Sequence, residues 1–423
     1  MEKKILVYHP FGNQNVRGVL NGLSQHNMLH SFHTTFAVFP QTYIYRLAQR
    51  FHFIKILKRE YDSSLENKTS IYPIKELIRQ SNILPRIGLK NISSGSINIS
   101  INKKVAKYIS KKYKTIDAVY CYTHGALEIF KVCKTHNIKC FYELPIEYYK
   151  NLLEIIQKEK EENPLWTNDI HTYNKSENLH IIDEELNLAD CIIVASTYLQ
   201  KSLLKFGFDK EKIHVVPYGF PPISPKKYRA IDGKIKILYV GGLHQLKGLS
   251  YMFDAVNDLS QQVELTIIGS GNISKHLSKE LKKHKYLGSL SHQQVLKEMK
   301  ENDILLFPTL SDGFGMVVSE AMSQGTPVIA TDHCCSIDII QDGVNGWIVP
   351  SRSSKAIKEK ILYLLKHPNE IEINGNNALQ TASSRPWQCY QNDIISIIKK
   401  TKNDDTNKKD FTTQLDCHSI LQF

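Results

Sequence analysis

The chain has 423 residues, and this length fits two α/β domains better than one. Its composition, 42% hydrophobic and 23% charged, is ordinary for a soluble globular protein, and no apolar run approaches the about 18 residues needed to span a bilayer. The formal net charge of +12 favours anionic partners, but no recognisable nucleic-acid-binding module accompanies it, so nucleic-acid binding is not expected.

The N-terminal segment is poor in acids and rich in bases. Lys3 and Lys4 precede a predicted strand at Ile5–Tyr8, and this apolar run is shorter than the core of a secretory signal, at least about seven residues. No Asp or Glu occurs from Lys3 to Arg59, so we expect a positive field around this half. Residues 44–59 interleave basic, aromatic and aliphatic side chains. Two interpretations stay open: a helix that lies in an anionic membrane surface, or a core-packing helix with a basic outer face.

The eight cysteines show no CxxC spacing and no histidine at the spacing of a zinc site. Several lie in apolar, strand-like runs such as residues 191–194. This pattern predicts buried, reduced thiols and a reducing, cytoplasmic compartment. The cysteines are Cys121, Cys133, Cys140, Cys191, Cys334, Cys335, Cys389 and Cys417.

Short apolar strands alternate with amphipathic helical patterns through most of the chain. Helical patterns include residues 249–259 and 291–300. Near-continuous apolar strands that alternate with helices predict parallel sheets covered on both faces. The predicted strands are Ile5–Tyr8, Ala118–Tyr122, Cys140–Leu144, Cys191–Ser196 and His214–Tyr218 in the first half, and Lys236–Gly241, Val263–Gly269, Asp303–Pro308 and Pro327–Thr331 in the second.

A Pro- and Gly-rich stretch, residues 217–225, has the composition of an interdomain linker. It divides a first domain, 1–220, from a second, 221–385. We expect residues 386–401 to form a C-terminal helix that packs back on the first domain. The polar residues 402–423 lose periodicity and predict a mobile tail.

Residues 146–187 form a predicted helical insertion of mixed charge in the first domain. A break near Asn163 and Pro164 divides it. The sequence leaves open whether this insertion is a lid over a site or a cover for the sheet.

The segment most informative about chemistry is residues 311–330. It follows the apolar strand 304–307, passes through a turn with Gly313 and Gly315, and then opens a helix. Amides at a helix N-terminus favour anions, and glycines let the backbone approach a ligand closely. Asp312 is predicted at the carboxyl edge of the sheet, where open α/β sheets bind ligands. Glu320 is predicted a turn or more into the helix, where its carboxylate can accept two vicinal sugar hydroxyls.

This segment resembles the donor-binding signature of the family 4 glycosyltransferases, retaining enzymes of the GT-B fold. That signature is Glu-x7-Glu, and here Asp312 and Glu320 take the two places. Residues 240–248 resemble the family's phosphate-binding turn, in which Lys247 matches the family's lysine. Further segments that match are 214–219, 268–271, 288–290 and 342–349.

The resemblance implies a GT-B fold, with two Rossmann-like parallel-sheet domains facing each other across a cleft. The first domain would bind the acceptor and the second the donor. Three residues are implied as catalytic or as closest to the reacting sugar. Asp312 would hold a hydroxyl of the transferred sugar, Lys247 would neutralise the departing diphosphate, and His124 would contact the donor sugar, although a purely structural role for His124 stays open.

The remaining donor contacts are implied by the same resemblance. Glu320 would hold the ribose hydroxyls, and the helix-opening segment would line the sugar and phosphate pocket with backbone amides. Gly242 stands where the family often has an arginine, and Arg17 is a candidate to supply the missing cation. The residues implied for the donor are Glu320, Gly313, Phe314, Gly315, Met316, Val317, Gly242, Gly12, Arg17, Gly269 and Leu287.

The function implied is retaining, metal-independent transfer of a hexose from a nucleotide-diphosphate-sugar to a glycan, polysaccharide or lipid-linked acceptor. The nucleotide-sugar is a co-substrate, so no cofactor is expected, and the chain has no Asp-x-Asp motif to hold a metal. The expected place is the cytoplasm, and peripheral association with the inner face of the membrane stays open. Because Asp312 and Gly242 depart from the family pattern, a catalytically silent GT-B protein that binds a glycan or scaffolds a partner glycosyltransferase stays the alternative.

Overall fold

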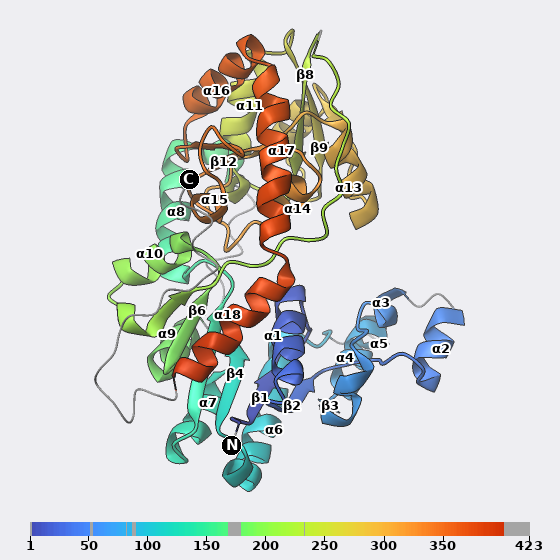
Figure 1. The fold of residues 1–423 in the computed structure, drawn as a ribbon, viewed down its shortest axis with the longest axis vertical. Coiled ribbons are helices and arrows are strands. Elements are labelled where there is room, and N and C mark those ends of the chain that lie inside the picture. The colour runs from blue at the N-terminus through green and yellow to red at the C-terminus, as the bar shows by residue number, and fades with distance from the viewer. Residues whose placement is uncertain are drawn as a thin grey trace.

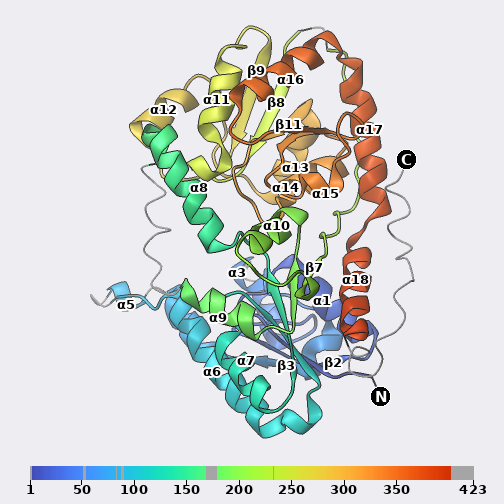
Figure 2. The same cartoon turned by 90° about the vertical axis from the view of Figure 1, so that its left-hand side faces the viewer.

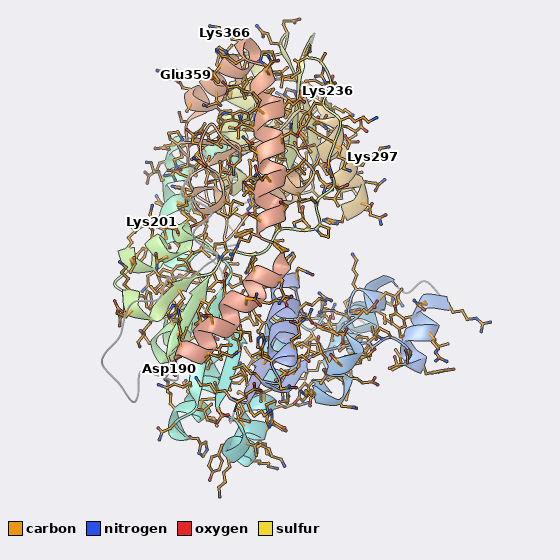
Figure 3. All side chains as sticks on the ribbon, in the orientation of Figure 1. Asp190, Lys201, Lys236, Lys297, Glu359 and Lys366 are labelled. Atoms are coloured by element: carbon orange, nitrogen blue, oxygen red, sulfur yellow. The ribbon has the colours of Figure 1, made fainter. Side chains whose placement is uncertain are left out.

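The computed structural model describes residues 2–50, 54–81, 83–86, 90–167, 179–231 and 233–401. Two α/β domains lie end to end along the long axis (Figure 1). Charged side chains such as Lys201, Lys297 and Lys366 lie on the outside of the molecule (Figure 3). Among the described residues, no helix is both long enough and apolar enough to cross a membrane. The predicted tail, 402–423, lies outside the described residues.

The N-terminal domain is built on a seven-stranded sheet with the order β3-β2-β1-β4-β5-β6-β7, and every pair in it is parallel. Ile5 and Val7 of β1 face one buried cluster and Leu6 and Tyr8 face another, so both faces of the sheet are covered. The strands are β1 Ile5–Tyr8, β2 Leu29–Thr34, β3 Thr69–Ile71, β4 Ala118–Tyr122, β5 Lys139–Leu144, β6 Cys191–Val194 and β7 Ile213–Val215.

The helices of this half surround the sheet, except that α2 to α5 project sideways from it (Figure 1) and α8 runs along the C-terminal domain (Figure 2). They are α1 Gln14–Gln25, α2 Tyr43–Arg50, α3 Ile54–Leu57, α4 Ile74–Ser81, α5 Ile83–Arg86, α6 Ser94–Lys112, α7 Leu127–Thr135, α8 Tyr149–Glu162, α9 His180–Leu188 and α10 Thr197–Lys205.

The C-terminal domain holds a six-stranded parallel sheet with the order β10-β9-β8-β11-β12-β13. Its strands are β8 Ile235–Val240, β9 Val263–Ile268, β10 Lys285–Tyr286, β11 Ile304–Phe307, β12 Val328–Thr331 and β13 Trp347–Val349. Its helices are α11 Leu249–Asn257, α12 Lys275–Leu281, α13 His292–Glu301, α14 Met316–Ser323, α15 Ser336–Ile339, α16 Ser354–Lys366, α17 Asn369–Ser384 and α18 Trp387–Lys400.

All nine strands predicted from apolar runs are present. The bounds of β1 and β4 match the prediction, and the ends of the others differ by at most three residues. Four strands escaped prediction. β2 carries polar side chains among its apolar ones, and β3, β10 and β13 have three residues or fewer. Short strands at a sheet edge leave too few residues for a periodic signal. The α/β class with two parallel-sheet, Rossmann-like domains is confirmed.

The last helix returns to the N-terminal domain. α18 packs on α1, where a side-chain atom added at Gly18 would lie 2.9 Å from the Tyr390 ring. Beside it runs the interdomain linker, because the amide of Phe220 donates to the carbonyl of Arg385 at 2.9 Å. Figure 2 shows α17 and α18 as one edge of the molecule that spans both domains. Two chain crossings therefore lie side by side at this junction.

The first part of the insertion after β5, α8 and the turn at 164–166, packs on the opposite domain. Ile155 and Ile156 of α8 lie in the buried core around β8 and β9, and Trp166 stacks on Phe253 of α11 with ring centroids 5.5 Å apart. Figure 2 shows α8 running upward beside α11 and α12. A division at residue 220 therefore assigns α8 to the N-terminal domain by chain order, although its core contacts are C-terminal.

Six of the described cysteines are buried, and Cys389 is partly buried. Their burial agrees with the prediction from their apolar sequence neighbours. Cys417 lies outside the described residues.

Candidate active site

Both sheets reverse their strand order at one point. In the C-terminal sheet β8 and β11 are neighbours, and the loops that follow them lie at the facing carboxyl edge. In the N-terminal sheet β1 and β4 have the same relation. Ligands of open α/β sheets bind at such reversal points. The loops after β8 and β11 carry Lys247 and Asp312, and the loops after β1 and β4 carry Gly12 and His124.

The turn after β8 is pressed against the end of β11. A single 3-10 turn, η6 Gln245–Lys247, ends at Gly248, whose φ is +72°. A side-chain atom at Gly248 would lie 1.8 Å from the carbonyl oxygen of Pro308, so only glycine allows this approach. The amide of Leu310 then donates to the carbonyl of Leu246 at 2.9 Å. These contacts bring Lys247 to the loop that holds Asp312.

Lys247 and Asp312 form an ion pair, with 2.5 Å between Nζ and Oδ2. The other carboxylate oxygen of Asp312 accepts the amide of Phe314 at 3.2 Å. The two side chains are 19% and 23% exposed, so the pair is mostly buried but still accessible to solvent. The structure thus joins two residues that lie 65 positions apart and that sequence analysis assigned to one site.

The loop continues into α14, whose N-cap is Gly315. Helix geometry leaves the first amides, those of Met316 and Val317, without a partner inside the helix. Amides so placed attract an anion. Gly315 itself adopts a φ of +81° at this bend.

Glu320 lies in the second turn of α14 and is partly exposed. Its Oε1 lies 3.1 Å from Nε2 of His292, at the start of α13. Burial raises the pKa of Glu320, and His292 opposes that rise. The His292 ring is 62% exposed, so it can leave the carboxylate without breaking a buried contact.

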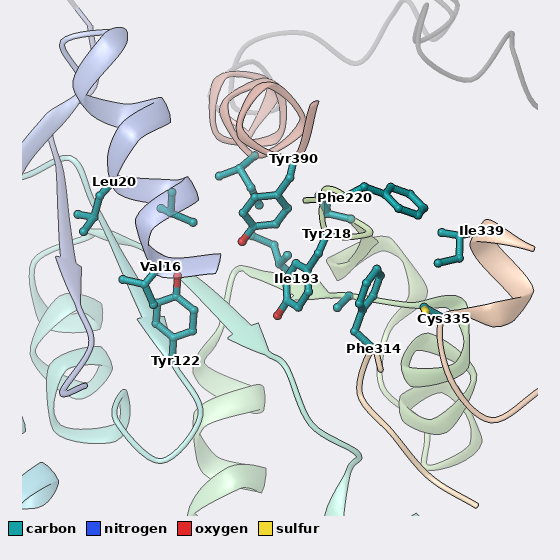
Figure 4. Close-up of a cluster of buried hydrophobic side chains, with 14 of the residues drawn as sticks. Val16, Leu20, Tyr122, Ile193, Tyr218, Phe220, Phe314, Cys335, Ile339 and Tyr390 are labelled. Atoms are coloured by element: carbon teal, nitrogen blue, oxygen red, sulfur yellow. The ribbon is translucent and has the colours of Figure 1, made fainter. Parts of the chain in front are cut away.

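The same loop also touches the N-terminal domain. The carbonyl of Gly313 accepts the hydroxyl of Ser196 at 2.8 Å, and a side-chain atom at Gly313 would lie 1.8 Å from the carbonyl oxygen of Pro145. The Phe314 ring lies 4.9 Å from that of Tyr218, within a buried cluster that also includes Tyr390 of α18 (Figure 4). Phe314 thus anchors the loop by its ring, and its amide is already bonded to Asp312.

Three further residues implied for the donor lie at the same sheet edge. The carbonyl of Gly242 accepts the hydroxyl of Tyr239 at 2.8 Å. The amide of Gly269 donates to the carbonyl of Gly288 at 2.9 Å, and that of Leu287 donates to Ile267 at 3.0 Å. The ends of β8, β9 and β10 are therefore tied into one edge beside η6.

Across the cleft, the Gly12 turn is organised by a histidine. Nδ1 of His9 accepts the amides of Phe11 and Gly12 at 3.1 and 2.6 Å. Burial, with a smaller effect of nearby Arg59, lowers the pKa of His9 to about 3, so the ring stays a neutral acceptor.

Arg17 does not reach out from this turn. Its guanidinium donates to the carbonyls of Lys58 (2.9 Å), Glu60 (3.3 Å) and Gly12 (3.4 Å), and it lies over the Tyr61 ring. The backbone of its own domain thus engages the guanidinium, and the role of Arg17 as the cation missing at Gly242 stays a prediction.

His124 follows β4 in a left-handed conformation, with a φ of 62°. Its side chain is exposed, and partial desolvation lowers its pKa. The turn is held by Glu185 of α9, which accepts the amides of His124 (2.9 Å), Ala126 (2.8 Å) and Leu127 (3.2 Å). These amides lie at the N-terminus of α7, where a carboxylate is favoured. Sequence analysis missed Glu185.

Two more buried acids were also missed. Glu143 of β5 accepts four hydrogen bonds, from Tyr120 (2.6 Å), Asn15 (2.7 Å), Tyr218 (2.9 Å) and Tyr390 (3.1 Å). It thereby ties the linker and α18 to the sheet, and burial raises its pKa. A charged residue inside the apolar run of residues 140–144 was the available signal.

Glu147 follows the same strand. It accepts the hydroxyl of Ser202 and, at 3.3 Å, that of Ser311, the residue before Asp312. Within the described part of the chain, no group of three or more His, Cys, Asp or Glu side chains is placed to hold a metal ion.

Part of the chain matches a known protein family. Residues 222–381 match the family described as "Glycosyl transferases group 1". The C-terminal domain is a group 1 glycosyl transferase domain. The group 1 domain contains η6, the Asp312 loop and α14, which together form the candidate site.

The relatives are distant. The amylovoran biosynthesis glycosyltransferase AmsK of Erwinia amylovora is 28% identical over 195 residues, which cover 41% of this chain and 47% of AmsK. The chain thus matches about half the length of this curated relative.

Beyond the group 1 domain, the likeness is one of fold. HepE of Anabaena in complex with UDP has a TM-score of 0.59 at 15% identity, covering 94% of this chain and 100% of HepE. The lipopolysaccharide outer core galactosyltransferase WaaB has a TM-score of 0.60 at 17% identity, covering 94% and 99%. The GT-B fold expected from the sequence is confirmed.

Proposed function

We propose that this protein is a retaining glycosyltransferase that moves a hexose from a nucleotide-diphosphate-sugar to a glycan, polysaccharide or glycolipid acceptor. One observation carries the proposal. A cation, Lys247, and the N-terminus of α14 converge at the strand reversal of the group 1 domain, with Glu320 one turn further along the same helix. A diphosphate next to a ribose has the charges and hydroxyls that such a set of groups would bind.

The chemistry requires positive charge where the diphosphate departs. The bond from the anomeric carbon to the diphosphate oxygen breaks, and a bond to the acceptor oxygen forms on the same face. The acceptor's proton passes to the leaving phosphate, so no separate base is assigned. Lys247 and the first amides of α14 stabilise the growing negative charge. In the structure Asp312 pairs with Lys247. We infer that the diphosphate replaces Asp312 there and frees this carboxylate for a sugar hydroxyl.

Glu320 would accept the two ribose hydroxyls after His292 releases it. On the facing edge, His124 has a lowered pKa, so its ring is neutral at pH 7 and suits a hydrogen bond to the sugar. We propose transfer without a metal ion, which predicts full activity in excess EDTA. Two similar proteins support the donor and acceptor classes: HepE was crystallised with UDP, and AmsK is named for amylovoran biosynthesis.

Calorimetric titration with UDP, GDP and ADP tests the donor site. Glu320→Ala should lower the affinity for whichever nucleotide binds by about tenfold or more, because a charge-assisted contact worth about 1.5–3 kcal/mol is lost. Glu359→Ala, which changes an exposed residue of α16, is the matched control. Absence of binding by all three nucleotides in folded protein would favour the alternative, a silent GT-B protein that binds a glycan or scaffolds a partner transferase.

We also propose that the projecting segment of residues 43–86 brings the protein to an anionic membrane at the cytoplasmic face. Only Ala48 of α2 is buried, which does not support the core-packing interpretation of this helix. Tyr43 and Ile44 of α2 are 75% and 53% exposed, and Ile74 of α4 is 71% exposed. Apolar side chains among basic ones suit an anionic lipid surface. Residues 51–53, part of the predicted helix, lie outside the described residues.

Liposome sedimentation with and without anionic lipid tests this second proposal. Ile44→Ser with Ile74→Ser should move the protein to the supernatant, whereas Ile373→Ser, at an exposed position of α17, should not. Equal recovery of the wild-type protein in the supernatant with both lipid mixtures at low salt would refute the proposal.

A further inference from the structure

α8 carries a carboxylate from the N-terminal half of the chain into the core of the C-terminal domain. Glu159 is fully buried. Its oxygens accept hydrogen bonds from Nε of Arg352 at 2.6 Å and from Nε2 of Gln245 at 2.7 Å. Asn163 and the hydroxyl of Tyr251 donate at 3.0 and 3.1 Å. A carboxylate that is buried away from water needs such a complete set of donors, because an unpaired buried charge is strongly destabilising.

Arg352 adopts a disfavoured backbone conformation where it meets this carboxylate. Its φ is 61°, in the left-handed region that costs energy for a residue with a side chain. The guanidinium also donates to the carbonyl of Ile155, one turn earlier on α8, at 3.2 Å. The loop before α16 is therefore tied to α8 at two points, and its shape depends on that helix.

Gln245 connects Glu159 to the candidate phosphate turn. It is buried and begins η6, the turn whose last residue is Lys247. Its Nε2 donates to Glu159 and to the hydroxyl of Ser250 (2.6 Å), so its Oε1 is left to accept the amide of Ser250 at 3.2 Å. The carboxylate of Glu159 thus fixes the orientation of the Gln245 side-chain amide. Through this amide, Gln245 before Lys247 is joined to Ser250 after it.

The other end of the same segment contacts the second loop of the site. Just before α8, Glu147 accepts the hydroxyl of Ser311, and the carbonyl of Pro145 lies against Gly313. The segment 145–163 therefore touches the loop of Asp312 at its start and the turn of Lys247 at its end.

We propose that Glu159 is a positioning residue for Lys247, and that α8 is a brace which holds the phosphate turn in register with the Asp312 loop. This inference rests on the proposed donor site and goes beyond it, because it assigns the shape of the phosphate pocket to a helix outside the group 1 domain.

Calorimetry with pairs of nucleotides separates positioning of Lys247 from general stability. The pairs are UDP and UMP, GDP and GMP, and ADP and AMP. A displaced Lys247 weakens the contact to the terminal phosphate of a diphosphate and spares base and ribose. We expect Glu159→Gln to lower the affinity for the bound diphosphate about tenfold and that for its monophosphate less than twofold. Amide hydrogen exchange in residues 245–250 should become faster.

Glu162→Gln is the matched control, because Glu162 lies on the same helix, is exposed and pairs only loosely with Lys158 at 3.7 Å. It should leave both affinities and the exchange rates unchanged. Gln245→Leu provides a second variant that keeps Glu159 bonded to Arg352, and it should show the same selective loss if Glu159→Gln does not fold.

A wild-type ratio of diphosphate to monophosphate affinity in either folded variant would overturn the inference, and so would an equal loss for both nucleotides. Wild-type protein that binds none of the six nucleotides would instead overturn the proposed function, and this inference with it.

Discussion

The two sides of the cleft hold their loops by different means. In the C-terminal domain, glycines bring backbone against backbone: Gly248 lies on the carbonyl of Pro308, and Gly313 on that of Pro145. In the N-terminal domain, buried carboxylates collect amides and hydroxyls, as Glu143 and Glu185 do. Glycine turns next to strands form compact motifs that sequence displays directly. A carboxylate that accepts hydrogen bonds from distant elements leaves no motif, so the sequence of the N-terminal loops carries a weaker signal.

On the C-terminal side, the largest functional effect is expected at Lys247. Lys247→Ala removes the cation that faces the departing diphosphate, and we expect kcat for sugar transfer or donor hydrolysis to fall about 10²–10³-fold. Lys297→Ala, on the exposed surface of α13, should leave kcat unchanged. The measurement uses the nucleotide-sugar whose nucleotide binds in calorimetry. An unchanged kcat for Lys247→Ala would remove Lys247 from the chemistry.

On the N-terminal side, the largest effect is expected at Glu185. Glu185→Gln places an amide group among three backbone donors and the hydroxyl of Tyr142, so at least one donor loses its acceptor. Urea unfolding should show a loss of about 1–3 kcal/mol in the free energy of unfolding. The neighbouring Glu184 is exposed and pairs with Lys131 at 3.2 Å, so Glu184→Gln should stay within about 0.5 kcal/mol of wild type.

If Glu185 positions His124, the variant should also shift the titration of the His124 ring in NMR spectra. A loss of stability with an unchanged His124 titration would assign Glu185 a structural role only.

A smaller effect concerns pH and Glu320. Only the ionised carboxylate accepts both ribose hydroxyls, and burial raises the pKa of Glu320 from its ordinary value. Nucleotide affinity should therefore be full above this raised pKa and fall by about tenfold as the pH drops through it. The nucleotide's own phosphate titrates near pH 6, so Glu320→Gln at each pH is the reference. A constant ratio of wild-type to Glu320→Gln affinity between pH 4.5 and about pH 8 would contradict the assignment.

Part of the candidate C-terminal site was predicted from the sequence. Asp312 and Glu320 were singled out from the glycine turn and the helix that follows it, and Lys247 from the family resemblance. The structure brings Lys247 and Asp312 into contact. The alternation of apolar strands likewise predicted the parallel sheets. In each case the deciding interactions are local, or they follow from the rule that parallel strands end at one edge of the sheet.

Other features depend on contacts between distant parts of the chain. α8 has an ordinary amphipathic pattern, and nothing in it tells which domain its apolar face will meet. Arg17 was a reasonable candidate cation, but carbonyls of Lys58 and Glu60, more than forty residues away, engage it. The roles of Glu143, Glu159 and Glu185 depend on partners that only the fold assembles.

The smallest effect is expected where the chain departs from its family pattern. Asp312→Glu would restore the first acid of the signature and extend its reach by about 1.5 Å. Since the shorter acid already meets Lys247 at 2.5 Å, the longer one can keep that pair by folding back, so nucleotide affinity should change less than about threefold.

The preference for the transferred sugar should change instead, because the carboxylate of residue 312 would approach the hydroxyls of that ring. A panel of nucleotide-sugars with one nucleotide and different hexoses measures it as a changed order of kcat/KM. Asp312→Asn, which keeps the length and removes the charge, is the control. If Asp312→Glu alone turned an inactive protein into an active one, the departure at Asp312 would be the cause of a silent site, and the two facing loops would then serve binding rather than transfer.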